Sequence, residues 1–200
     1  MINEKQILED AYTLISELWC SPQDVDMKEL KKDSEGVIPA LENIEGNCAL
    51  LLFKFLNSKP IPEEKYIEFF ELEPKCSLYL GSHSFDEPKT CAGAGVSDRN
   101  KYMIDLLGIY KHFGQEISGG ELPDYLPLMV NFLSLTVRKN DDPIREKFIG
   151  EYVLPFLPPM RKRLDELKTH YLHLFDALEK VINYDLSRKS LTLKEKTYVE

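Results

Sequence analysis

The sequence lacks a surplus of positive charge and a long apolar run. Its 200 residues contain 25 Lys and Arg against 34 Asp and Glu, a formal net charge of -9. Phosphate backbones are bound through a surplus of Lys and Arg, so we expect no nucleic-acid partner. No segment approaches the ~20 apolar residues of a membrane span, and the polar start at residues 1–6 predicts no signal peptide. We therefore expect a cytoplasmic protein. Its acidic surface would attract a basic partner.

The sequence marks of catalysis and metal binding are also missing. There is no Gly-x-Ser-x-Gly, no Glu-x-x-His pair and no Cys-x-x-Cys, and Gly93-x-Gly95 lacks the third glycine of a phosphate loop. His170 and His173 lie one helical turn apart, but no carboxylate on the same helix completes a metal site. We therefore predict no catalytic residue, no metal and no cofactor. An enzyme remains one alternative to the binding and scaffold functions considered below.

Apolar residues recur at helical spacing along most of the chain, and no segment alternates as a strand does. The pattern predicts helices over residues 7–18, 24–32, 37–56 and 98–113, further helices that start near 62, 123 and 142, and a last helical region over 160–181 with a possible break at 168–170. Residues 84–97 are expected to form a loop. The predicted fold is a single all-α domain over residues 1–185, a bundle of about eight or nine helices, followed by a loose polar tail at 186–200.

One segment, Glu121-Leu122-Pro123-Asp124-Tyr125-Leu126-Pro127, places two acids and two prolines before an apolar helix. On physical grounds alone, the acids would cap the N-terminus of that helix, where negative charge is stabilised. The alternative is that Glu121 and Asp124 lie at the mouth of a groove and bind Arg. The residue pattern leaves both interpretations open.

The same segment, followed by Asn131-Phe132-Leu133, resembles the motif of the TorD/NarJ-type molybdoenzyme assembly chaperones, which include the nitrate reductase delta subunit. The resemblance extends to Tyr66–Leu80 with Ser77-Leu78-Tyr79-Leu80 and His83, to Asp98–Gly114, and to Tyr152-Val153-Leu154-Pro155, and covers about residues 5–182. Tyr125 stands where many relatives have His. The resemblance implies an all-helical TorD-like chaperone without catalytic activity, in some relatives a homodimer.

The resemblance further implies that the chain binds the N-terminal leader of a molybdoenzyme catalytic subunit, often a twin-arginine signal, until the molybdenum cofactor is inserted. Such a leader carries Arg beside an apolar stretch, which requires apolar walls and acids at the rim. The predicted peptide-binding residues are Glu121, Leu122, Pro123, Asp124, Tyr125, Leu126, Tyr79 and His83. The alternative is a helical scaffold or regulatory module without a peptide groove, which would dimerise through the apolar seam between Met160 and Val181.

Overall fold

The computed structural model describes residues 3–85, 97–117 and 119–197, with side chains described as far as residue 188. The α-helices are α1 (Glu4–Leu18), α2 (Met27–Glu42), α3 (Gly46–Leu56), α4 (Glu63–Phe70), α6 (Asp98–His112), α7 (Leu126–Thr136), α8 (Pro143–Lys147), α9 (Leu157–Leu167) and α10 (Tyr171–Thr197). Short 3-10 turns span Leu80–His83, Val137–Lys139 and Leu154–Phe156, and a π-helical turn spans Phe148–Val153. The described residues contain no named strand, which confirms the all-α prediction.

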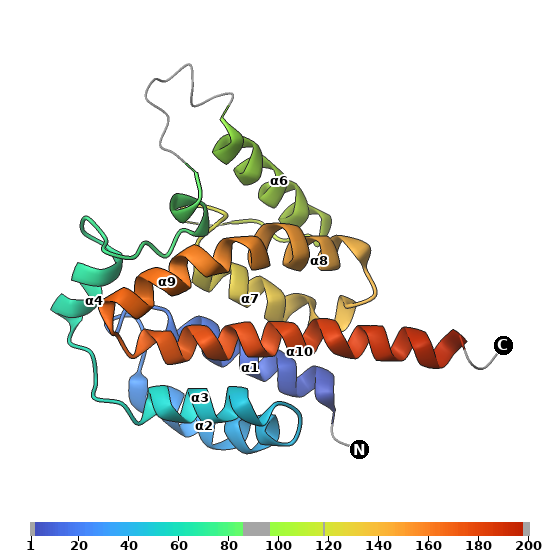
Figure 1. Ribbon diagram of the computed structural model, residues 1–200, viewed down its shortest axis with the longest axis horizontal. Helices are drawn as coiled ribbons and strands as arrows, with labels where there is room; N and C mark the ends of the chain where they lie inside the picture. The colour runs from blue at the N-terminus through green and yellow to red at the C-terminus, as the bar shows by residue number, and fades with distance from the viewer. Residues whose placement is uncertain (1–2, 86–96, 118, 198–200) are drawn as a thin grey trace.

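Helices α1 and α10 form the centre of the bundle (Figure 1). Helix α1 packs against α7 and α2, while α10 packs against α3, α1 and α9. Helix α6 lies at the far side of the molecule from α2 and α3, beyond the run that continues from α8 into α9. Trp19, which is fully buried at the end of α1, stacks on Tyr171 of α10 with 5.2 Å between ring centroids. A continuous apolar core therefore runs through the bundle.

The helix boundaries differ from the predicted ones between residues 24 and 56. The charged helix expected at 24–32 continues through Gly36 to Glu42, and the break falls at residues 43–45 instead. Gly36 was expected to separate two helices, but it lies in the interior of α2, as does the exposed Pro39. Both residues are unfavourable within helices. Burial of Leu30, Ser34 and Leu41 on the inner face of α2 offsets that cost.

The final helical region breaks where the sequence suggested. Lys168 adopts a left-handed conformation with φ of 50°, and α9 turns there into α10. Helix α10 then continues to Thr197, so the tail expected to be loose after residue 185 is helical. The predicted loop at 84–97, with Gly93 and Gly95, lies mostly outside the described residues.

The apolar seam from Met160 to Val181 is buried within this one chain. Met160, Leu164 and Leu174 are fully buried, and so are Leu178 and Val181. Helices α9 and α10 bury the seam between each other and the rest of the bundle (Figure 1). The seam therefore packs mainly within the chain, with Leu167 partly exposed, which argues against its use for dimerisation.

A buried ion pair joins four helices on the side of the bundle away from Trp19. The Arg145 guanidinium donates to Asp185 Oδ2 at 2.7 Å and to Thr136 Oγ1 at 3.1 Å. Asp185 also accepts a hydrogen bond from the Tyr12 hydroxyl at 3.2 Å and one from Arg188. Burial and the Asp185 carboxylate raise the pKa of Tyr12 well above its usual value. These contacts fix α1, α7, α8 and α10 relative to one another.

Among the described residues, no helix combines the length and the apolar character that crossing a membrane requires.

Candidate functional site

The candidate site forms where two segments far apart in sequence pair with each other. The Leu80 N–H donates to the Asp124 carbonyl at 3.0 Å, and the Leu126 N–H donates to the Leu78 carbonyl at 2.8 Å. These two bonds form an isolated antiparallel bridge that places Tyr79 opposite Tyr125. The pairing thus brings together two of the segments that carry the family resemblance.

Asp124 lies beneath this pairing and not at its surface. Its side chain is 0% exposed, and Oδ2 accepts a hydrogen bond from the Gly81 N–H at 2.9 Å. Helix α7 begins after Asp124, with Tyr125 as its N-cap and no side-chain capping bond. Both sequence interpretations of Asp124, as a helix cap and as a surface partner of Arg, are therefore wrong in this conformation. Its carboxylate instead stabilises the contact between the two paired segments.

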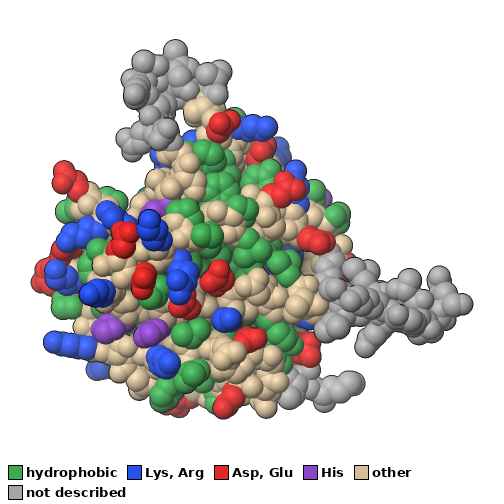
Figure 2. Space-filling view, viewed as in Figure 1, with side chains coloured by type: hydrophobic (Ala, Val, Ile, Leu, Met, Phe, Trp, Pro, Cys, Tyr) green, Lys and Arg blue, Asp and Glu red, His purple; other side chains and the backbone are tan. Residues whose placement is uncertain are grey.

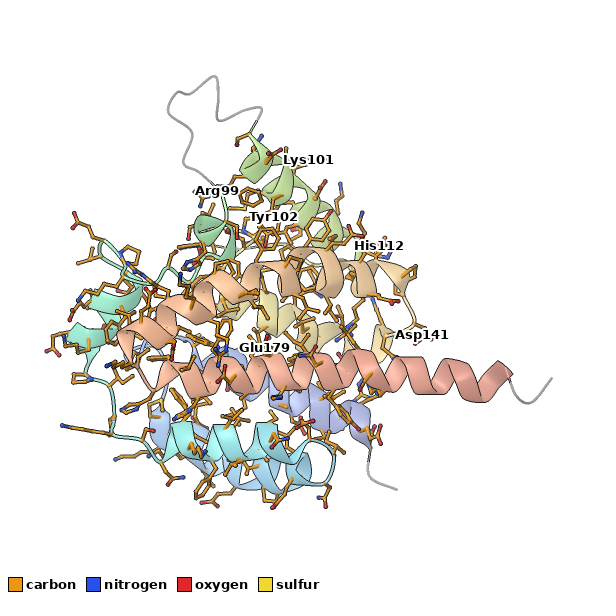
Figure 3. All side chains as sticks on the ribbon, viewed as in Figure 1. Arg99, Lys101, Tyr102, His112, Asp141 and Glu179 are labelled. Carbon is orange, nitrogen blue, oxygen red and sulfur yellow. The ribbon has the colours of Figure 1, made fainter. Side chains whose placement is uncertain are left out.

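The second oxygen of Asp124, Oδ1, is buried without a hydrogen-bond partner among the described residues. Burial raises the pKa of Asp124 above its usual value, while the Gly81 hydrogen bond and the positive charge of Arg99 act in the opposite direction. Arg99 and Tyr102 lie at the start of α6, next to the turn that holds Gly81 (Figure 3). The ionised carboxylate is therefore stabilised incompletely by its surroundings.

Gly81 is a site residue that the sequence did not single out. A Cβ at this position would lie 2.8 Å from Asp124 Oδ2 and 3.3 Å from Tyr102 Cε1. Any larger side chain would displace the carboxylate or the aromatic ring. Tyr110 is a second such residue, because its hydroxyl donates to the Pro123 carbonyl at 2.7 Å and so anchors the segment to α6. Neither role has a local sequence signal, since each depends on a partner distant in the chain.

The part of the site that reaches the surface consists of Tyr79, Glu121, Leu122 and Tyr125. The two tyrosine rings are tilted against each other with 5.5 Å between centroids, and both are partly exposed. Leu122 is 43% exposed. Glu121 Oε1 accepts hydrogen bonds from the Tyr79 hydroxyl and from the Leu122 N–H, both at 2.9 Å. Burial and this carboxylate raise the pKa of Tyr79 to about 12, so its hydroxyl remains a donor at neutral pH.

The remaining predicted residues, Pro123, Leu126 and His83, are buried or form their hydrogen bonds within the fold. Pro123 is buried, and Leu126 is fully buried in the core, so neither forms a groove wall. The His83 Nε2 donates to the Ser77 carbonyl at 2.7 Å, and burial lowers the pKa of its imidazole. His83 is therefore a neutral ring that holds the turn closed. No group of three potential metal ligands occurs within the described ranges.

A well-defined apolar cavity lies apart from the predicted site. A cavity of about 160 Å³ opens between the end of α1, the start of α2, the end of α3 and the start of α10, and it is lined mainly by apolar side chains. None of the eight predicted peptide-binding residues lines it. Tyr79, Glu121, Leu122 and Tyr125 form a partly exposed surface patch with one acid, which we call the tyrosine patch.

Comparison with known proteins identifies relatives of the chain. It is 32% identical over 130 residues to the probable nitrate reductase molybdenum cofactor assembly chaperone NarW of Escherichia coli K12, a match that covers 65% of this chain and 51% of NarW. It is 31% identical over 122 residues to the nitrate reductase molybdenum cofactor assembly chaperone NarJ of the same strain, covering 60% of this chain and 46% of NarJ. The chain is a homologue of these NarJ-type chaperones.

This homology confirms the resemblance to the TorD/NarJ-type family. The chain spans about half the length of the curated NarJ-type relatives that it matches. Both relatives are named as assembly chaperones and not as catalysts. No family model matches the sequence.

Proposed function

We propose that the protein is a cytoplasmic, non-enzymatic chaperone for the assembly of a molybdenum-containing oxidoreductase. In this proposal the tyrosine patch binds the twin-arginine-type N-terminal leader of the catalytic subunit. It holds this leader until the molybdenum cofactor is inserted. The similarity to NarW and NarJ supports the chaperone role. The partly exposed pair of Tyr79 and Tyr125 beside a carboxylate is the single observation that supports a leader-binding role.

The chemistry of the tyrosine patch suits a peptide that carries Arg next to apolar residues. Glu121 Oε1 is occupied by two donors, while Oε2 takes part in no hydrogen bond among the described residues. A guanidinium could bind Oε2 and stack on the adjacent tyrosine rings, since charge-assisted bonds and cation–π contacts both favour Arg. The half-exposed Leu122 would contact the apolar stretch of the leader. Tyrosine is also among the residue types that contribute most to binding energy.

A peptide titration tests the proposal. The probe is a synthetic, fluorescently labelled peptide with two consecutive arginines followed by an apolar stretch, and binding is measured by anisotropy. Glu121→Gln removes the charge but keeps the hydrogen-bond acceptor of Oε1, and we expect about tenfold weaker binding at low salt. Raising the salt should shrink the difference, because exposed charges are screened.

The matched control is Glu35→Gln on the exposed surface of α2, which makes the same change of charge away from the patch. This variant should bind the peptide like the unmodified protein. Equal binding by Glu121→Gln and the unmodified protein would remove Glu121 from the site. Failure of the unmodified protein to prefer this peptide over one with Glu in place of Arg would refute leader binding altogether.

A scaffold role without a peptide site is the alternative. No observation favours it, because the seam proposed for dimerisation is buried inside the bundle. A homodimer, if formed, would use another surface.

A further inference from the structure

The apolar cavity described above differs from the tyrosine patch in the sign of its charge. Its walls include Leu18, Met27, Phe55, Leu56, Ile61 and Tyr171, and its polar side chains include Lys31, Lys59 and His170. A second cavity of about 240 Å³ adjoins it and shares Lys59, Pro60, Ile61 and His170. The second cavity adds Lys65 and Lys168 to the lining. We call the two cavities together the cationic groove.

No carboxylate lines either cavity, although acids outnumber bases in the chain. Many Lys, Arg and His side chains lie at the end of the molecule where α4 and the turn between α9 and α10 lie, with Asp and Glu side chains among them (Figure 2). Acids do lie close by: Asp24 and Glu17 act on the Cys20 thiol at the edge of the groove, and Glu68 bonds to Lys65. The linings themselves thus carry basic but no acidic side chains, on a protein that is negative overall.

Some of these cations are neutralised within the fold and others are not. Lys65 and Lys75 both bond to Glu68 on α4. Lys31, Lys59 and Lys168 have no ion pair with any carboxylate in the described part of the chain. Lys31 and Lys59 are exposed and lie at the rim of the same apolar cavity. Two ammonium groups without an ion pair in the described part of the chain thus flank an apolar cavity.

We propose that the cationic groove binds an acidic segment of a partner protein that inserts a large apolar side chain between flanking carboxylates. An apolar cavity of about 150 Å³ holds one aromatic ring, so the 160 Å³ cavity matches a single Phe or Leu anchor. Carboxylates on either side of the anchor would pair with Lys31 and Lys59. A basic leader peptide would be repelled here, so this is a second site with the opposite preference in charge.

The negative charge of the whole protein does not prevent this binding. Charges separated by more than about 8–10 Å are largely screened at physiological ionic strength. At contact distance the lysines of the rim therefore dominate over remote carboxylates. The net charge would slow the approach of an acidic segment, and the local field would hold it once it is docked.

The test uses two labelled peptides and the full chain. One is a short amphipathic peptide with Leu and Phe at helical spacing and Glu at the other positions, and its counterpart has Lys in place of every Glu. We expect the acidic peptide to bind at least about tenfold more tightly, a difference of about 1.4 kcal/mol. The double variant Lys31→Glu/Lys59→Glu should reverse this preference.

The control variant Lys101→Glu/Lys111→Glu makes the same change of net charge on exposed positions of α6, away from the groove (Figure 3). It should retain the preference for the acidic peptide. The Lys31→Glu/Lys59→Glu variant should also bind the basic leader peptide at least as well as the unmodified protein, which separates this site from the tyrosine patch.

Three outcomes would overturn the proposal. The acidic peptide could bind no more tightly than its basic counterpart. The α6 control could lose the preference as completely as the groove variant, which would assign the effect to net charge. Finally, sedimentation could show that the unmodified protein self-associates and that Lys31→Glu/Lys59→Glu abolishes this association, which would assign the groove to a second copy of the chain.

Discussion

Replacement of Asp124 by Asn separates a structural role of this residue from a role in peptide contact. In the structure, one carboxylate oxygen accepts the Gly81 N–H and the other is buried without a partner. An Asn side chain keeps one acceptor for Gly81 and removes a charge that its surroundings stabilise poorly. Because the side chain is 0% exposed, we expect leader-peptide binding to be unchanged by Asp124→Asn.

The expected effect on stability depends on pH, and its sign follows from the pKa of Asp124. Burial raises this pKa above its usual value of 3.8, so the folded protein binds the proton more tightly than the unfolded chain does. Asp124 therefore favours folding most below pH 3.8, and this contribution declines as pH rises through the raised pKa. The Asn variant lacks this decline.

Urea unfolding between about pH 4 and 7 measures the difference between Asp124→Asn and the unmodified protein. At neutral pH the new amide donor lacks an acceptor, which costs about 1–3 kcal/mol, while removal of the buried charge offsets a similar amount. We expect stabilities within about 1 kcal/mol of each other at neutral pH and a relative gain for the variant as pH rises. A difference independent of pH would refute this reasoning. Loss of leader binding by a folded Asp124→Asn protein would restore Asp124 as a contact residue.

Three further changes test the fold around the site by thermal and urea unfolding. Gly81→Ala should destabilise the protein by about 1–3 kcal/mol through the contact with the neighbouring carboxylate, whereas Gly108→Ala, which meets nothing within 4 Å, should be neutral or stabilising. Arg145→Met should cost about 3–5 kcal/mol, because it leaves the fully buried Asp185 without its main partner, and a loss below 1 kcal/mol would contradict that role. Tyr79→Phe should cost at most about 1 kcal/mol of stability, because the hydrogen bond that it removes is partly exposed, and a larger loss would show that the tyrosine patch also supports the fold.

The sequence predicted the helices wherever apolar periodicity decides the structure. The stripe of Ile7, Leu14 and Leu18 forms the buried face of α1. The break at Lys168 falls within the stretch 168–170 where a break was predicted, although the spacing of the apolar seam continues across it. Prediction failed at residues 24–56, because local signals and tertiary packing disagree there. Gly36 is a helix breaker by propensity, but packing of α2 against α1 and α3 outweighs its cost.

The site was predicted only in part, for a related physical reason. The resemblance selected both segments that pair at the bridge between Tyr79 and Tyr125. It did not reveal which side chains of those segments face inward. A carboxylate before an apolar helix has a ready local explanation as a cap, so the burial of Asp124 against Gly81 could not be seen without the fold. The cationic groove was missed because its lining comes from segments between Leu18 and Tyr171 that share no motif.

A layer of buried aromatic rings separates the two proposed binding surfaces. Tyr66 contacts Tyr171 with 6.2 Å between ring centroids, and its hydroxyl donates to the Trp19 carbonyl at 2.8 Å. Tyr125 interacts with Tyr66 on the side of the tyrosine patch, and Tyr171 lines the cationic groove on the other side. A close-packed layer of this kind is rigid. It also screens the electric field between the two surfaces less than water would. Under the two proposals, Glu121 on one surface would select a basic segment and Lys31 and Lys59 on the other an acidic one, and the charges of the two surfaces would remain coupled through this layer.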